Sequence, residues 1–461
     1  MTTYSAVVTT GIYCRPGCAA QPRAENVRTF GLAAAAEAAG FRACHRCRPY
    51  RVAGPVSSGA PELACQALQL IIDGALDDGG NEEDLARRIG VSARHLRRLF
   101  VAHLGATPDQ LARSRRAHFA RRLLDDTDLP VIDVAFASGF GSLRQFNRAM
   151  QEVFRASPTS LRSRRHRADR LVADGGLVLR LPVLPGYDWD ATLPFLRARL
   201  VPGVEAAGDG TYRRTICVAG SPGVLEVCAG GAGNLLLRAH LPYWEGLIHV
   251  VDRAGRLLGI DADHGLGVAA LSADRTLGHL VRRRPGLAVP GAWDLFELGC
   301  QAILSRDRKP ADAARALEAL VASLGTPVPG LAGGLTHMFP AAATVAEAGD
   351  TGLCAADSRA VRSLAVALQE TSYGTGSGRA DFLAGVDPDI RDYLALRTGR
   401  RSAFPVSDPS LSAGLDDLRG CLIGDSDELA VRLRDWHPWL ALAAAHLMAH
   451  GDSLLRPDQP A

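Results

Sequence analysis

The chain has 461 residues, of which 47% are hydrophobic and 22% charged. This composition excludes wholesale disorder and, at about 150 residues per domain, predicts about three domains. The net charge is only +3, yet Lys309 is the sole lysine, so almost all positive charge is guanidinium, which grips phosphates bidentately. Because no uncharged apolar run reaches the roughly 18 residues of a membrane span and no signal-peptide layout opens the chain, we expect a cytoplasmic protein without a membrane partner.

Residues 1–50 are rich in cysteine and turns. A Cys-x3-Cys pair and a Cys-x2-Cys pair are separated by 25 residues, which is the arrangement a tetrahedral Zn2+ needs when two chain segments meet around it. In a reducing compartment such spacing favours metal binding over disulfides. Spacing alone favours a structural zinc that lets a 50-residue piece fold without a large core. The predicted ligands are Cys14, Cys18, Cys44 and Cys47.

The residues around these cysteines add a functional alternative. Residues 10–18 (TGIYCRPGC) and 40–47 (GFRACHRC) resemble the Ada methyl-acceptor domain. The resemblance implies that Cys14 is both a zinc ligand and a sacrificial nucleophile, which takes a methyl group from a methylated DNA phosphate and is not regenerated. Metal coordination keeps the thiolate deprotonated, and a methyl phosphotriester is uncharged, so the anionic site can approach it. Methylation would remove one negative charge and strengthen DNA binding.

A Gly/Pro/Ser-rich stretch, residues 51–60, predicts a linker, and residues 61–167 have helical periodicity with arginines on the opposite faces. Ala86 and Gly90, and 49 residues later Ala135 and Gly139, have the spacing of two helix-turn-helix units, in which alanine lets two helices cross closely and glycine makes the turn. Residues 92–100 and 141–150 are then the helices that enter major grooves. The candidates that face the bases are Arg94, His95, Arg97, Arg98, Arg144, Gln145, Asn147 and Arg148.

The alternative for this segment is a solvated arginine face. Residues 129–140 (LPVIDVAFASGF) and 154–158 (FRASP), however, resemble the AraC-type DNA-binding domain, and the resemblance covers residues 61–165. It implies an all-α double helix-turn-helix domain that binds specific double-stranded promoter DNA, with RNA polymerase as a further partner. In Ada-like regulators this module receives the methyl signal from the zinc domain.

Beyond a joint at residues 173–176 the period changes to two, with strands predicted at 212–218, 224–228 and 234–241. We expect an antiparallel sheet within 177–270 and a mostly helical domain over 271–455. Residues 182–455 resemble AlkA, a 3-methyladenine DNA glycosylase, through the matches 185–189 (PGYDW), 202–205 (PGVE), 212–215 (YRRT) and 289–294 (VPGAWD). The resemblance implies a multidomain α+β protein whose last domain has a helix-hairpin-helix core.

The glycosylase resemblance also implies site residues. Asp408, in residues 404–408 (FPVSD), takes the position of the carboxylate that stabilises positive charge on the sugar while the N-glycosidic bond is hydrolysed. Without the resemblance, an aspartate before a proline predicts an ordinary turn or cap. Phe195, Tyr393 and Trp439 are candidates for the base pocket; for Trp439, as for Trp436, the alternative is the core.

Four places depart from the glycosylase pattern. In the hairpin, residues 383–391 (LAGVDPDIR), Asp387 replaces a glycine and Asp389 a tryptophan, so two carboxylates would face a DNA phosphate. The loop that fills the gap left by a flipped base is charged, residues 305–309 (SRDRK), and includes Asp307. Met448 replaces a second pocket tryptophan. We therefore hypothesise that excision of alkylated bases is weak, altered in substrate, or lost; the competing interpretation is an activator whose last domain only binds DNA or a ligand.

Overall fold

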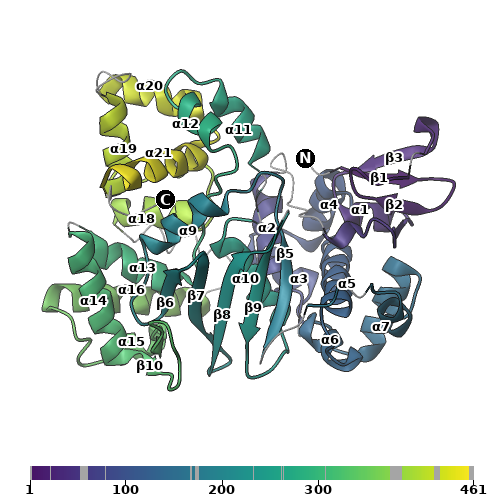
Figure 1. Cartoon of the computed structure of the whole chain (residues 1–461), viewed down its shortest axis with the longest axis horizontal. Coiled ribbons are helices and arrows are strands. Elements are labelled where there is room, and N and C mark those ends of the chain that lie inside the picture. Colours follow the sequence, from purple (N-terminus) through teal and green to yellow (C-terminus); the bar gives the residue numbers. More distant parts are fainter. Residues whose placement is uncertain are drawn as a thin grey trace.

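The computed structural model describes residues 3–455 except 21, 52–60, 78, 167–168, 172–175, 232, 261, 263, 307, 374–386 and 420–425. Figure 1 shows a small sheet domain at the N-terminus, a group of helices beside it, and a larger part in which a twisted sheet is flanked by helices. The multidomain α+β architecture predicted from the sequence is confirmed.

The N-terminal domain is a four-stranded sheet with strand order β3-β1-β2-β4. Strands β1–β2 and β1–β3 are antiparallel, whereas β2 and β4 are parallel. Its buried centre is aromatic, with the rings of Tyr4 and Tyr13 edge to face at 5.8 Å. The elements are β1 (Tyr4–Val7), β2 (Ile12–Cys14), η1 (Ala24–Asn26), β3 (Val27–Phe30), α1 (Ala33–Ala38), β4 (Arg42–Ala43) and η2 (Pro49–Arg51).

The middle of the chain is helical. Its elements are α2 (Glu62–Ile72), α3 (Glu82–Arg88), α4 (Ala93–Leu104), α5 (Pro108–Asp126), α6 (Val131–Ala137), α7 (Leu143–Phe154) and α8 (Pro158–Ser163). The two turns predicted from glycine are present, because Gly90 and Gly139 have φ values of +73° and +78°, which side chains disfavour. Ser92 and Ser142 cap α4 and α7 through their hydroxyl groups. The two helices predicted after these turns are present as α4 and α7, and each runs four residues beyond its predicted end.

The five-stranded antiparallel sheet of the C-terminal part has the order β5-β9-β8-β7-β6. Along β9, buried and half-buried residues alternate, as expected for a sheet with one face on the core. The strands are β5 (Leu177–Pro182), β6 (Glu205–Gly208), β7 (Thr211–Val218), β8 (Ser221–Ala229) and β9 (Asn234–His240), with a small pair β10 (Thr326–Pro327) and β11 (His337–Met338).

Helices surround this sheet and form the rest of the C-terminal part (Figure 1). Those described are α9 (Trp189–Arg197), α10 (Leu247–Leu257), α11 (Gly265–Ser272), α12 (Gly278–Arg283), α13 (Leu295–Ser305), α14 (Pro310–Leu324), α15 (Ala342–Glu347), α16 (Ala355–Tyr373), α18 (Pro388–Arg397), α19 (Pro409–Arg419), α20 (Ser426–Trp436) and α21 (Leu440–Leu455). Among the described residues, no helix combines the length and apolarity that crossing a bilayer requires.

The three parts share one buried core. A single cluster of packed apolar residues includes Tyr13 of β2, Leu123 of α5, Leu179 of β5 and Leu247 of α10. Helix α5 lies at the centre of this arrangement, because it contacts α1 of the N-terminal domain, α7 of the helical region and β5 of the sheet. The domains are therefore packed against one another rather than joined only by linkers.

Candidate metal centre, DNA-binding helices and base pocket

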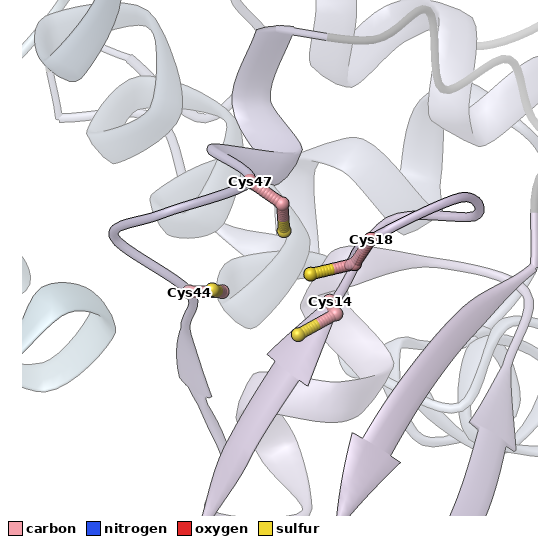
Figure 2. A group of neighbouring side chains, drawn as sticks. All are labelled: Cys14, Cys18, Cys44 and Cys47. Carbon is pink, nitrogen blue, oxygen red and sulfur yellow. The ribbon is translucent and has the colours of Figure 1, made fainter. Parts of the chain in front are cut away.

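The four predicted ligands come together at one edge of the N-terminal sheet. Figure 2 shows the four side chains with their sulfur atoms turned toward a common centre, and these atoms all lie within 4.8 Å of one another. Four thiolates around Zn2+ at about 2.3 Å have sulfur atoms about 3.8 Å apart. The donor set and its dimensions fit a four-coordinate metal: Cys14, Cys18, Cys44 and Cys47.

Local backbone pairing explains why the cysteines meet. Cys14 ends β2 and Cys44 follows β4, and the parallel pairing of these strands places the two residues side by side. The backbone N–H of Cys44 donates to the carbonyl of Tyr13 at 3.0 Å. Cys18 and Cys47 reach the same place through tight turns that directly follow Cys14 and Cys44. Two short sequence motifs thus become one site through a single pair of strands.

The electrostatics of the cluster depend on what occupies it. Burial, together with the neighbouring thiols, raises the pKa of Cys14, and burial raises the pKa of Cys47 to about 12. For Cys44 burial acts in the same direction, but hydrogen bonds from the backbone of Cys47 and Arg46 outweigh it and lower the pKa. Without a cation the sulfur of Cys14 therefore stays protonated at neutral pH and is a poor nucleophile.

The residue beside Cys14 attaches the metal site to the helical region. The hydroxyl group of Tyr13 donates to Glu37 of α1 at 2.6 Å and lies 3.0 Å from Nε2 of His118 on α5. His118 in turn lies 2.7 Å from the same Glu37 oxygen. A second attachment lies at the end of the N-terminal domain, where the hydroxyl group of Tyr50 donates to Asp125 of α5 at 2.7 Å. The metal-site strand β2 is thus bonded to the helix that joins the two helix-turn-helix units.

The predicted base-reading residues lie on the outer faces of the two recognition helices. Of the eight, seven are exposed and His95 is half-buried. Four already bond within the protein: Arg97 Nη2 lies 2.5 Å from Glu82, Arg148 Nε lies 2.8 Å from Glu152, and Arg98 Nη2 lies 3.2 Å from Nδ1 of His95. The exposed set is Arg94, Arg97, Arg98, Arg144, Gln145, Asn147 and Arg148.

Asp408 is half-buried at the start of α19. Its Oδ1 accepts the backbone N–H groups of Ser410 at 2.9 Å and Leu411 at 3.0 Å, so the carboxylate caps this helix. Close by, Ser410 donates from its hydroxyl group to Asp452 at 2.6 Å, and Arg199 donates to the same carboxylate at 2.8 Å. Burial opposes the charge of Arg199, but Asp452 and other nearby groups, Asp408 among them, hold its pKa above the usual range.

Two of the three predicted pocket aromatics share one neighbourhood. Phe195 has the guanidinium of Arg199 at 3.9 Å from its ring centre and that of Arg397 at 5.2 Å. Arg397 also lies 5.7 Å from the ring of Tyr393 and donates to its hydroxyl group at 2.8 Å. The adjoining cavity has a volume of about 10 Å³, and Arg199 and Arg397, which cover Phe195, are among the residues that line it. In this conformation it has room for about one water molecule.

The third predicted aromatic lies elsewhere. Trp439 packs against Gly267 of α11, and Arg401 lies 6.0 Å from its ring. Trp436 is only 1% exposed, and its ring centre lies 6.0 Å from that of Phe404, so it belongs to the core. Met448 is also buried in the core. Of the three predicted pocket aromatics, Phe195 and Tyr393 therefore lie together against Arg397, and the sequence analysis included neither Arg397 nor Arg199.

The charged substitutions in the hairpin and in the loop after α13 are partly paired with each other. Arg306 donates to Asp387 at 2.7 Å, and Arg308 donates to Asp357 at 2.6 Å. Asp387 is thus joined to an arginine of the loop that was expected to fill the flipped-base gap. Asp307, the hairpin residues before Asp387, and the side chain of Asp389 lie outside the described residues.

These features define the class of the protein: a multidomain protein with a four-cysteine domain suited to a metal ion, two helix-turn-helix units and a glycosylase-like domain. Three families match the corresponding segments, the metal binding domain of Ada at residues 2–50, a helix-turn-helix domain at 85–164, and the AlkA N-terminal domain at 178–294.

Similarity to one relative extends over nearly the whole chain. The "Probable bifunctional transcriptional activator/DNA repair enzyme AlkA" of Mycobacterium tuberculosis is 37% identical over 96% of this chain and 91% of its own. The chain therefore belongs to the family of bifunctional transcriptional activator/DNA repair enzymes of the Ada-AlkA type. Two Escherichia coli proteins match parts of it: the activator/repair enzyme Ada (38% identity, 26% of this chain, 32% of that one) and DNA-3-methyladenine glycosylase 2 (35%, 30% and 48%).

Proposed function

We propose that Cys14 accepts a methyl group from a methyl phosphotriester in DNA. The four-cysteine geometry and the match of residues 2–50 to the metal binding domain of Ada support this. Exposure does not select Cys14, because it is the most buried of the four cysteines. The position of Cys14 in the Ada-like motif of residues 10–18 selects it. A bound Zn2+ would keep the thiols deprotonated at neutral pH, which the buried site does not do by itself.

The transfer balances without a further reactant. The sulfur of Cys14 attacks the methyl carbon, an S–C bond forms, and the O–C bond of the phosphotriester breaks. The electron pair stays on the phosphate oxygen, which restores an ordinary phosphodiester. Cys14 becomes a neutral thioether, so the site loses one negative charge and its repulsion from DNA phosphates falls.

Mass spectrometry tests this step. After incubation with DNA that carries methyl phosphotriesters, the peptide that contains Cys14 should gain about 14 Da, the mass of one methyl group replacing a proton. A Cys14→Ser variant should gain nothing, while Cys65→Ser, which changes a half-buried cysteine outside the cluster, should behave as the wild type. A gain on Cys18, Cys44 or Cys47 instead would reject Cys14 as the acceptor.

We further propose that the two exposed helix faces read promoter DNA, and that methylation of Cys14 strengthens this binding and so recruits RNA polymerase. Arg144 is exposed, whereas Arg148 already donates to Glu152. Arg144→Ala should therefore weaken binding to a selected site by about 1–3 kcal/mol and relax the base preference at one position. Arg148→Ala should cost less. Equal losses for both variants on selected and random DNA would contradict base reading by Arg144.

For the C-terminal domain we propose hydrolytic excision of alkylated bases of the 3-methyladenine type, with Asp408 stabilising the charge that develops on the sugar. Release of alkylated adenine from methylated DNA, and its loss in Asp408→Asn, tests the proposal. A second candidate function is DNA binding without base excision. It is favoured by the two guanidinium groups that cover Phe195 and by the neighbouring cavity, which has room for only about one water molecule. If no base is released while DNA binding is retained, the domain acts as a DNA-binding module.

A further inference from the structure

A row of ion pairs joins the glycosylase-like domain to the helix-turn-helix region along α10. Arg115 pairs with Asp252, and Arg256 pairs with Asp73. Asp77 lies 2.9 Å from Nε2 of His249 and also pairs with Arg116. All seven side chains of this row are at least two-thirds buried. We call it the α10 seam: Asp73, Asp77, Arg115, Arg116, His249, Asp252 and Arg256.

The seam contacts the first helix-turn-helix unit and the helix that follows it. Asp73 and Asp77 lie in the turn after α2, the helix that packs against α3 and α4 of the first unit. Arg115 and Arg116 lie on α5, which connects the two units, and they donate to the carbonyls of Ile72 at 3.2 Å and Leu76 at 2.6 Å. The turn after α2 is thus bonded both to α5 and to α10 of the glycosylase-like domain.

The same helix also reaches the second unit. The backbone N–H of Gly246, which caps α10, donates to the carbonyl of Phe136 in α6 at 3.4 Å. A Cβ on Gly139, the turn residue of the second unit, would lie 3.5 Å from the Cγ2 of Ile248. Leu247 and Ile248 are fully buried in the same core cluster as Val134 and Phe140. Helix α10 therefore contacts the first unit, the second unit and the helix between them.

We propose that α10 fixes the relative orientation of the two helix-turn-helix units and thereby sets the spacing of the two DNA elements that they read. Two recognition helices on one face of DNA must lie about one helical turn apart, so a small rotation of one unit displaces it from its groove. A link through α5 alone would leave that rotation to the packing of one helix. The glycosylase-like domain is then part of the promoter-reading unit, whether or not methyl acceptance or base excision takes place.

A charge swap across the seam tests this proposal in the full-length chain. Asp73→Arg places like charges against Arg256 and Arg115, and Arg256→Asp places a carboxylate against Asp73; the double variant restores an opposite-charge pair. The probe is double-stranded DNA that the wild-type chain selects from a random library, together with versions in which one or two base pairs are inserted between its two elements.

The wild type should bind the inserted DNA about tenfold more weakly than the selected DNA. Each single variant should bind the selected DNA about tenfold more weakly than the wild type and should lose most of the preference for spacing. The double swap should recover both properties. A role in stability alone would lower the amount of folded protein without changing the preference for spacing.

Three results would overturn the proposal. The first is a single variant that keeps wild-type affinity and spacing preference, and the second is a double swap that recovers neither. The third is a selected DNA that contains only one element. If a single variant fails to fold, Asp252→Asn replaces it, because this change removes one charge from the seam without adding another. The Asp252→Asn variant should also bind the selected DNA more weakly and lose most of the preference for spacing.

Discussion

At the scale of single residues, the cysteine cluster shows how much a site can depend on a bound ion. Burial raises the pKa of both Cys14 and Cys47, so removal of the metal should leave Cys14 protonated and stop methyl acceptance at pH 7. The release of zinc to a chromogenic chelator, followed by methyl transfer before and after zinc is added back, measures this. Methyl acceptance at an unchanged rate in metal-free protein would contradict the expectation.

The second prediction at this scale concerns His446 and the pH dependence of stability. It is 3% exposed on α21, and burial, with His264 as a second cause, lowers its pKa from 6.5 to about 4. The unfolded chain therefore binds more protons than the folded chain between pH 6.5 and 4, and stability should fall as the pH falls through this window. The loss should total about 3 kcal/mol and be complete below pH 4.

Denaturant unfolding followed by tryptophan fluorescence at several pH values checks the size and the direction of this effect. His446→Phe should remove this part of the pH dependence, whereas His450→Phe, which changes a histidine near the end of the same helix that bonds to Asp417, should leave it in place. An equal response of the two variants would show that His446 is not the group responsible.

At the scale of elements, Asp408 caps α19 and is proposed to stabilise the sugar cation, and the variants Asp408→Asn and Asp408→Ala separate these two roles. As the cap of α19 it needs only an oxygen acceptor, whereas stabilisation of a cationic sugar needs a negative charge. Asp408→Asn should keep stability within about 0.5 kcal/mol and lose base release, and Asp408→Ala should in addition lose about 1 kcal/mol of stability. Thermal unfolding measures the capping role, and an excision assay measures the stabilisation of the sugar cation. Equal excision by the Asp408→Asn variant and the wild-type protein would show that Asp408 acts only as a helix cap.

The elements that the sequence predicted correctly are those with local causes. The recognition helices follow from serine caps and from glycines that need positive φ at residues 90 and 139. Their C-terminal ends were set too early. Helix α7 is capped by Arg155, which has a φ of +53°. Residues in this left-handed conformation at helix ends are usually glycine or asparagine, so an arginine does not indicate where the helix ends. The sequence allowed Asp408 to be predicted as a helix cap, because aspartate before proline is common at the start of a helix.

The pocket could not be predicted in the same way. Phe195 and Tyr393 lie nearly 200 positions apart in the chain, and both rings lie against the guanidinium group of Arg397. The pairing of Arg306 with Asp387 spans 81 positions. Each charge is visible in the sequence, but which opposite charge faces it depends on the tertiary fold. The sequence analysis therefore expected Asp387 to repel a DNA phosphate and did not include Arg306, which neutralises its charge.

At the scale of the whole molecule, the domains were predicted as separate units, but the structure packs them around α5. One core cluster contains residues of all three parts, and the pair between Arg48 and Asp169 spans 121 positions at 2.5 Å. Contacts of such sequence separation have no signature in periodicity or motif spacing. Domain content was accessible from the sequence, and domain packing was not.

This packing predicts how the chain unfolds. Because the helical region and the five-stranded sheet share a core, they should unfold together in one calorimetric transition rather than in two. Arg256→Asp, which opposes Asp73 in the α10 seam, should split the transition or broaden it. Two well-separated transitions in the wild type would show that the shared core contributes little to coupling the domains.

Helix α5 also has an evolutionary consequence. Its residues Arg115, Arg116 and Arg122 bond to the first unit or to the glycosylase-like domain, on whose β5 strand Arg122 meets the carbonyl of Arg180. Gene fission that left a stand-alone regulator would remove Asp252 from Arg115 and the carbonyl of Arg180 from Arg122, whereas Arg116 would keep its partners in the turn after α2. It would also remove apolar cover from α6 and its turn. A descendant without the last domain would need compensating substitutions on α5. The residues of α5 in related stand-alone regulators should therefore show whether those regulators arose by loss of that domain.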